Sequence, residues 1–237
     1  MVNDNILERI KHLFAMAEHA NSNKYEAAIA LEKAQALLLQ HNLSRANIDI
    51  NNGQPANHGI GQVIVTENTG YTWKRHLLGV IAKNNLCSVV GSPSTHAVHL
   101  FGSQDNVRSV LEMYYWVVEQ LINMATPLYK EYKQDGGYEN ARKWNAGFYQ
   151  GATLTIKRRL AKPMDDFQHG TGRDLVLANS NRLKLAVRSI FPSLRKSSYK
   201  LRPGDGFSRG RQAGDQVRFG RSKPLATGPK ALLTGQR

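Results

Sequence analysis

The stretch LCSVVGSPSTHAVHLFGS, residues 86–103, decides the fold class of this 237-residue chain. Two of its segments, 86–90 and 96–101, are short runs rich in apolar and β-branched residues, which is typical of strands. The residues between them, 91–94, favour a turn. Ser103 directly precedes a long helical pattern and is a good N-cap residue. The stretch therefore predicts a β-hairpin that is followed at once by a helix.

Helical periodicity dominates on both sides of this hairpin, because apolar residues recur there at spacings of three and four. Helices are expected around residues 73–81, 107–128, 144–159, 175–190 and 207–217, and a short strand is expected at 61–67. Pro127 is expected to kink or end the second of these helices. The segment PMDDFQHGTG, residues 163–172, is expected to be a break.

We therefore predict a mainly helical α+β protein. Four segments are expected: an N-terminal helical hairpin (1–43), a linker with a strand (44–70), an α+β domain with the β-hairpin between helices (71–160), and a basic C-terminal region with a helix and a mobile tail (161–237). In the last segment Gly210 and Gly214 are four residues apart, a spacing that lets a helix backbone pack closely against a neighbour.

The charge is concentrated near the C-terminus. Residues 1–70 contain 5 Lys and Arg against 7 Asp and Glu, residues 71–160 contain 11 against 6, and residues 161–237 contain 16 against 5. The three segments therefore contribute −2, +5 and +11 to the net charge of +14. Such an asymmetry favours a polyanionic partner, and nucleic acid is the first candidate.

The cations in question are mostly arginines with aromatic residues between them, a pattern that suits phosphate contacts and stacking on bases. The predicted nucleic-acid-binding residues are Arg158, Arg159, Arg188, Arg195, Lys196, Tyr199, Lys200, Arg202, Arg209, Arg211, Arg218 and Arg221. DNA is favoured over RNA. Phe207, which stands beside Gly210 and Gly214, is expected to anchor the tail to the core.

Catalytic and metal-binding patterns are weak. The single cysteine, Cys87, lies in an apolar strand pattern and is expected to act as a small buried hydrophobe. His96 and His99 are three apart in a predicted strand and so point to opposite faces. Asp165, Asp166 and His169 form a loose cluster that leaves a weak metal site open. We therefore predict no cofactor and no catalytic residue, although a role as an enzyme stays open.

No stretch of the sequence has the roughly 18 consecutive apolar residues that a membrane helix needs. One cysteine allows no internal disulfide, which fits a reducing compartment. We therefore expect no membrane partner and a cytoplasmic location.

The N-terminal segment carries a motif that resembles a known family. It reads ILERIKHLFAMAE from Ile6, then Asn23, EAA from Glu26, LEKAQALL from Leu31, and HNL from His41. This resembles a small domain of unknown function that is common in tailed bacteriophages, prophages and some bacterial genomes.

The middle region of the chain resembles the domain that often follows it, and the ending from Phe207 is similar to that family's ending. The shared elements are Trp73, Phe101-Gly102, the aromatic run 114–116, the Trp144, Phe148 and Gly151 set, Arg159-Leu160, and the ending FSRGRQAG from Phe207. The resemblance implies a phage or mobile-element origin, and hence the host cytoplasm, but it implies no particular activity.

The leading hypothesis is a phage-type, non-catalytic protein that associates with nucleic acid. Two alternatives stay open. The first is a metal-dependent enzyme that acts on nucleic acid. The second is a phage protein that binds and inhibits a host factor, with its basic surface against an acidic partner.

Overall fold

The computed structural model describes residues 59–65, 72–92, 97–169, 173–195 and 203–219, together with seven single positions of the N-terminal segment. The side chains of residues 72, 162–169 and 173–175 are outside this description. The seven N-terminal positions are all helical: Arg9, His12, Leu13, Met16, Ala30, Lys33 and Leu37. The predicted N-terminal hairpin otherwise lies outside the described residues.

A small antiparallel sheet lies at the centre of the fold. Its strands are β1 (Gly61–Val65), β2 (Ser88–Gly91) and β3 (Val98–Gly102), in the order β1-β3-β2. Leu100 of β3 is the register partner of both Val63 and Val89. The predicted β-hairpin is therefore confirmed as β2 and β3. The strand expected at 61–67 is also present, and it pairs with the other edge of β3.

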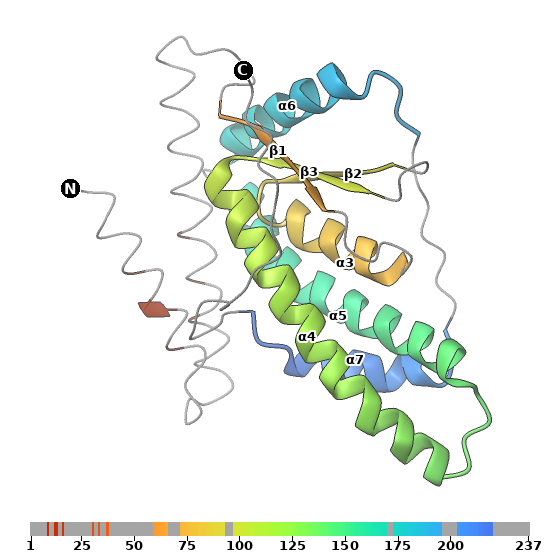
Figure 1. Cartoon of the computed structure of the whole chain (residues 1–237). Coiled ribbons are helices and arrows are strands. Elements are labelled where there is room, and N and C mark those ends of the chain that lie inside the picture. Colours follow the sequence, from red (N-terminus) through yellow and green to blue (C-terminus); the bar gives the residue numbers. More distant parts are fainter. Residues whose placement is uncertain are drawn as a thin grey trace.

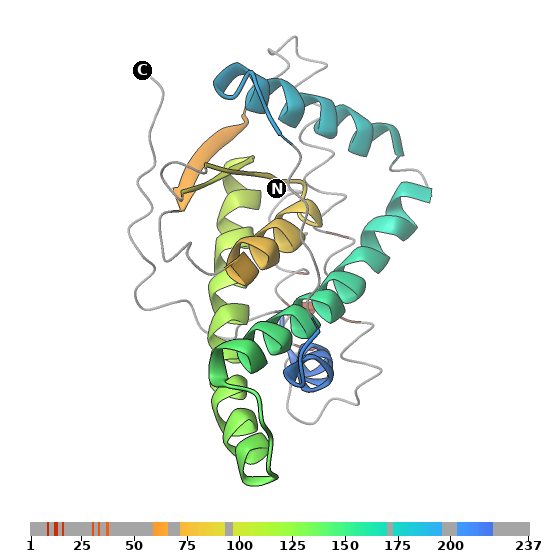
Figure 2. The ribbon, with the colours of Figure 1, turned by 90° about the vertical axis from the view of Figure 1, so that its right-hand side faces the viewer.

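Helices make up most of the described structure, so the mainly helical α+β class is confirmed (Figure 1). They are α3 (Thr72–Lys83), α4 (Gln104–Gln134), α5 (Ala141–His169), α6 (Arg173–Ile190) and α7 (Gly206–Gln216). In Figures 1 and 2, α6 lies on one face of the sheet, and α3 lies on the other face. Helices α5 and α7 lie on the far side of α3 from the sheet.

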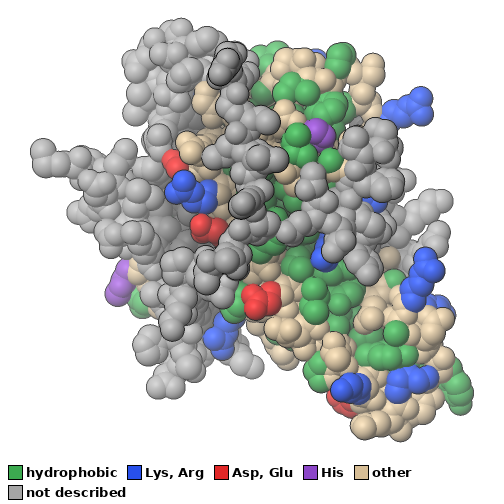
Figure 3. All heavy atoms as spheres, in the orientation of Figure 1, with side chains coloured by type: hydrophobic (Ala, Val, Ile, Leu, Met, Phe, Trp, Pro, Cys, Tyr) green, Lys and Arg blue, Asp and Glu red, His purple; other side chains and the backbone are tan. Residues whose placement is uncertain are grey.

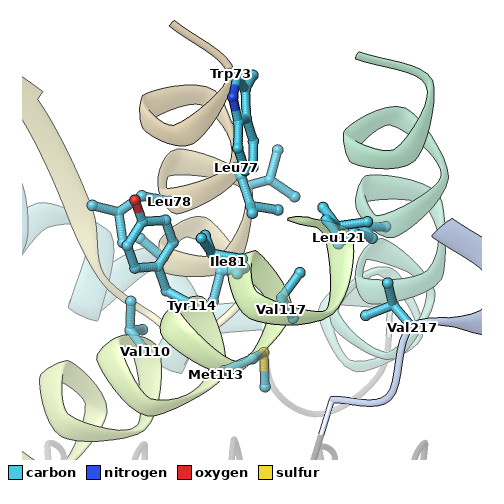
Figure 4. Close-up of a cluster of buried hydrophobic side chains, with 14 of the residues drawn as sticks. Trp73, Leu77, Leu78, Ile81, Val110, Met113, Tyr114, Val117, Leu121 and Val217 are labelled. Carbon is cyan, nitrogen blue, oxygen red and sulfur yellow. The ribbon is translucent and has the colours of Figure 1, made fainter. Parts of the chain in front are cut away.

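The alternation of side chains along β3 separates two hydrophobic clusters. Val98 and Leu100 belong to the main core, whereas Phe101 packs with Leu183 and Val187 of α6. Successive strand residues point to opposite faces of a sheet, so one strand serves both layers. The main core is built from α3 and α4 and extends to α5 and to Val217 at the end of α7 (Figure 4).

Neither Pro127 nor Pro163 ends a helix. Helix α4 continues through Pro127 to Gln134, and α5 continues through Pro163 to His169, so the break predicted at 163–172 is wrong for its first seven residues. A proline inside a helix costs about 3 kcal/mol. Burial on both sides of Pro127, where Leu121 and Ala125 precede it and Tyr129 follows, outweighs that cost.

Candidate nucleic-acid interface

The predicted nucleic-acid-binding residues fall into two groups in space. Arg188 and Arg195 belong to α6 and its C-terminal end, while Arg158, Arg159, Arg209, Arg211 and Arg218 belong to α5, α7 and the residues just after α7. Figures 1 and 2 show α6 and α7 at opposite ends of the stacked layers. Lys196, Tyr199, Lys200, Arg202 and Arg221 lie outside the described residues. In the view of Figure 3, the Lys and Arg side chains are scattered rather than gathered into one patch.

Helix α7 is held against α5 by glycines on both helices. A Cβ atom at Gly210 would lie 1.9 Å from the carbonyl oxygen of Phe148, and one at Gly151 would lie 2.1 Å from that of Phe207. At Gly214 the corresponding distance, to the carbonyl oxygen of Ala152, is 2.7 Å, which is also too short for a Cβ atom. The close approach expected from the spacing of Gly210 and Gly214 is therefore confirmed. It fixes α7, and the arginines on it, rigidly to α5.

The side chain of Arg159 packs against the C-terminal end of α7 and does not extend into solvent. One of its guanidinium nitrogens, Nη1, donates to the carbonyl oxygens of Gly214, at 2.7 Å, and Val217, at 2.8 Å. The guanidinium also lies 4.4 Å from the ring centroid of Phe219, which is itself buried. Burial lowers the pKa of Arg159. These carbonyls are at the C-terminal end of α7, where a cation is favourable, so Arg159 fastens the end of that helix.

Two further arginines form ion pairs at the surface. Arg158 lies 3.3 Å from Asp215 of α7, and Arg209 lies 3.0 Å from Glu131 of α4. All four side chains are largely open to solvent. Exposed pairs of this kind contribute about 0–1 kcal/mol, so both arginines stay accessible to a competing anion.

Of the predicted nucleic-acid-binding residues, four arginines are exposed and pair with no carboxylate among the described residues. They are Arg188, Arg195, Arg211 and Arg218. The backbone of Arg218 is fixed by the amide of Gln120, which donates to its carbonyl oxygen at 2.8 Å and accepts from its N–H at 2.9 Å. The side chain of Arg218 is therefore presented from a fixed position. Each of the four is open to an anionic partner.

A cluster of polar groups fixes the other end of α7, and no sequence pattern predicts it. The hydroxyl of Tyr132 donates to Asp205 Oδ2 at 2.5 Å and accepts from the N–H of Glu139 at 2.9 Å. Glu139 accepts from the N–H of Asp205 at 2.9 Å and pairs with Lys143 at 2.7 Å. We call Tyr132, Glu139 and Asp205 the polar clasp. Asp205 is 73 residues from Tyr132 and 66 residues from Glu139 in the sequence. A local sequence pattern therefore cannot predict that these side chains meet.

The residues considered for catalysis or metal binding either have packing and hydrogen-bonding roles or have side chains that are not described. Cys87 is buried, and burial raises the pKa of its thiol to about 12, so it behaves as the expected small hydrophobe. His99 interacts with the side chain of Gln62, while His96 is not described. Asp165, Asp166 and His169 are helical positions of α5 whose side chains are not described. Among the side chains that are described, no group of three His, Cys, Asp or Glu could hold a metal ion.

The fold and the surface together define a mainly helical α+β protein with a basic C-terminal region. Residues 5–45 match a family model described as protein of unknown function (DUF2786). The N-terminal motif is therefore similar to a family whose function is not assigned. No curated protein and no solved structure matches the chain. None of the helices in the described part is both long and apolar enough to cross a membrane.

Proposed function

We propose that this chain is a non-catalytic nucleic-acid-binding protein of phage type, which acts in the cytoplasm of a bacterial host and binds DNA in preference to RNA. The proposal rests on the charge of the C-terminal region, which is +11: three of its described arginines, Arg195, Arg211 and Arg218, are exposed and pair with no carboxylate among the described residues. Arginine forms forked hydrogen bonds to phosphate. The phage origin is supported by the resemblance of the N-terminal motif.

The phosphate contacts are assigned to two neighbouring stretches of the chain. The first is Arg211 and Arg218, which α7 and Gln120 hold in place on α5 and α4. The second is the basic segment 195–202, which lies between α6 and α7 in the sequence. Arg159 is left out of the interface, because its guanidinium is engaged by two carbonyl oxygens and an aromatic ring.

The test is a salt titration of binding, measured by fluorescence anisotropy with labelled duplex DNA, single-stranded DNA and RNA. Each lost phosphate contact makes the slope of log K against log salt shallower by about 0.9 on duplex DNA. The variant R211A/R218A is therefore expected to flatten the slope by up to about 2. The variant R195A/K196A/K200A/R202A is expected to flatten it by roughly 2–4. Y199A is expected to weaken single-strand binding by about 1–3 kcal/mol.

A matched control distinguishes binding at a defined interface from a general electrostatic attraction between the basic protein and nucleic acid. Lys83 and Arg108 are exposed cations outside the C-terminal region, so K83A/R108A removes the same charge as R211A/R218A. The proposal requires the control to keep the wild-type slope. Equal losses in both double variants, or unchanged slopes in folded R211A/R218A and in the four-fold variant, would contradict it.

A further inference from the structure

The outer face of α6 combines exposed leucines with cations. Leu177 and Leu185 are 53 % and 51 % exposed. They are eight residues apart, so they lie on the same side of the helix. Asn181, Lys184 and Arg188 are also exposed, and their spacing places them on this same side. We call these five residues the α6 outer face.

Two further apolar residues are exposed at the end of the helix and beyond it, although Ile190, the last helical residue, lies about 140° around the helix from Leu177. Ile190 is 48 % exposed and Leu194 is 51 % exposed. Four of the nine exposed large hydrophobic residues in the described part of the chain therefore lie within residues 177–194. Scattered exposed leucines are ordinary, but a concentration of them on one element is typical of an interaction surface.

These leucines are not needed to hold α6 in place. The opposite side of the helix packs through Leu183 and Val187 against Phe101 of the sheet. In addition, the side-chain amide of Asn179 donates to the carbonyl oxygen of Leu86 at 3.3 Å. The helix is therefore apolar on two sides, of which only one is used within the described fold.

The charge around this face has one sign. Between Asp174 and Asp205 the sequence contains seven Lys and Arg and no acidic residue. Lys184 and Arg188 lie among the leucines, and none of the described residues pairs with either cation. A partner that buries Leu177 and Leu185 must therefore place carboxylates opposite these two cations, because an uncompensated buried charge is strongly unfavourable.

We propose that the α6 outer face is a docking site for an acidic amphipathic helix of a partner protein. The partner's apolar stripe packs on Leu177 and Leu185, and its Asp and Glu residues pair with Lys184 and Arg188. Helix-in-groove and helix-on-helix recognition use apolar anchors at this spacing. The site is separate from the proposed nucleic-acid contacts at Arg211 and Arg218, which belong to α7 and the residues just after it. The other proposed contacts, 195–202, follow α6 in the sequence, and none of them is among the five residues of this face.

A protein partner fits this face better than nucleic acid or a membrane does. Aliphatic leucines neither bond phosphate nor stack on bases as aromatic rings do. A helix that lies in a membrane surface commonly places Trp or Phe among its buried residues and many cations on its polar face. The described part of the α6 outer face has no aromatic residue and only two cations.

The experiment uses the full chain and a synthetic helical peptide with Leu at positions i, i+3, i+4 and i+7 and Glu on the flanking positions. A second peptide has the same composition in scrambled order. Binding of each peptide is measured by fluorescence anisotropy. Binding to anionic vesicles of phosphatidylcholine and phosphatidylglycerol, and binding to labelled duplex DNA, are measured separately. The ordered peptide is expected to bind the wild type, and L177S/L185S and K184E/R188E are each expected to weaken that binding by about tenfold or more.

Two control variants complete the design. Leu154 is an exposed leucine of α5 and Lys130 is an exposed cation of α4, so L154S and K130E should bind the ordered peptide as the wild type does. Circular dichroism checks that the half-exposed substitutions leave the fold intact. The proposal is overturned by equal binding of the two peptides or by no loss in folded L177S/L185S. Vesicle binding that is lost in L177S/L185S would overturn it in favour of a membrane. The DNA measurement reports separately on the proposed function.

Discussion

The guanidinium of Arg159 lies 4.4 Å from the ring centroid of Phe219, 60 residues further along the chain. The same guanidinium donates to two carbonyl oxygens at the C-terminal end of α7. One side chain on α5 thus holds both the end of α7 and Phe219, three residues beyond it. Arg159, which the charge pattern predicts as a nucleic-acid contact, therefore has a packing role within the described fold.

We expect Arg159→Ala to lower the free energy of unfolding by about 2–4 kcal/mol, since it removes two charge-assisted hydrogen bonds and a cation–π contact. Urea denaturation measures the change. Arg158→Ala is the matched control, because Arg158 has only an exposed ion pair, and it should cost less than about 1 kcal/mol. A fully stable Arg159→Ala protein with a flatter salt slope for DNA would instead assign Arg159 to the interface.

A substitution at Gly210 tests whether the close contact between α5 and α7 stabilises the fold. A Cβ atom there would lie 1.9 Å from the carbonyl oxygen of Phe148, and a backbone atom cannot move aside as a flexible side chain can. Gly210→Ala is therefore expected to destabilise the protein by about 3 kcal/mol or more. Gly79 of α3 has no heavy atom within 4 Å of the corresponding position, so Gly79→Ala should stabilise by about 1 kcal/mol. Thermal melts of the two variants should move in opposite directions.

The polar clasp predicts a loss of stability at high pH. Desolvation, followed by the hydrogen bond to Asp205, raises the pKa of Tyr132 above its usual 10.0. A raised pKa means that the folded state holds this proton more tightly than the unfolded state. The contribution is therefore complete below pH 10 and is lost as the pH rises through the folded-state pKa.

We expect the melting temperature of the wild type to fall more steeply above pH 10 than that of Tyr132→Phe, which should already be less stable at pH 8. Tyr138 is 97 % exposed, so Tyr138→Phe should follow the wild-type curve. If Tyr132→Phe keeps the wild-type melting temperature at pH 8, the clasp does not stabilise the α7 contact.

The lowered pKa of His76 predicts a second effect of pH on stability, at acidic pH. Burial, together with the positive charge of Lys157, lowers the pKa of His76 from 6.5. The unfolded chain therefore takes up a proton near pH 6.5 that the folded protein resists. Stability should be complete above about pH 6.5 and should decline as the pH falls below it.

Lys157→Ala provides a specific test, because removing that charge lets the pKa of His76 rise towards its usual value. Melts between pH 7.5 and pH 5.5 should show a shallower decline in Lys157→Ala than in the wild type, and a shallower decline again in His76→Gln. An identical decline in all three proteins would show that His76 is not the group responsible.

The sequence by itself determined most of the elements. The β-hairpin at β2 and β3, the strand β1 and the helices α3 to α7 follow from apolar periodicity, turn residues and a Ser103 cap whose side chain accepts from the N–H of Asn106. These are local properties, since period and capping act within a few residues. The sequence left open whether Pro127 kinks or ends its helix. The helix continues because burial of the residues around Pro127, a tertiary effect, outweighs the local penalty.

Only the tertiary structure decided what each cation does. Arg158 and Arg159 are neighbours in the sequence, yet one points to solvent beside Asp215 and the other to the end of α7. The two directions differ by about 100° around α5, and the docking of α7 through Gly151 and Gly210 gives one of them partners. Charge and composition are additive along a chain and can be counted from its sequence. The pairing of each charge depends on which distant segment packs against it, and that is fixed by the shape of the assembled helices.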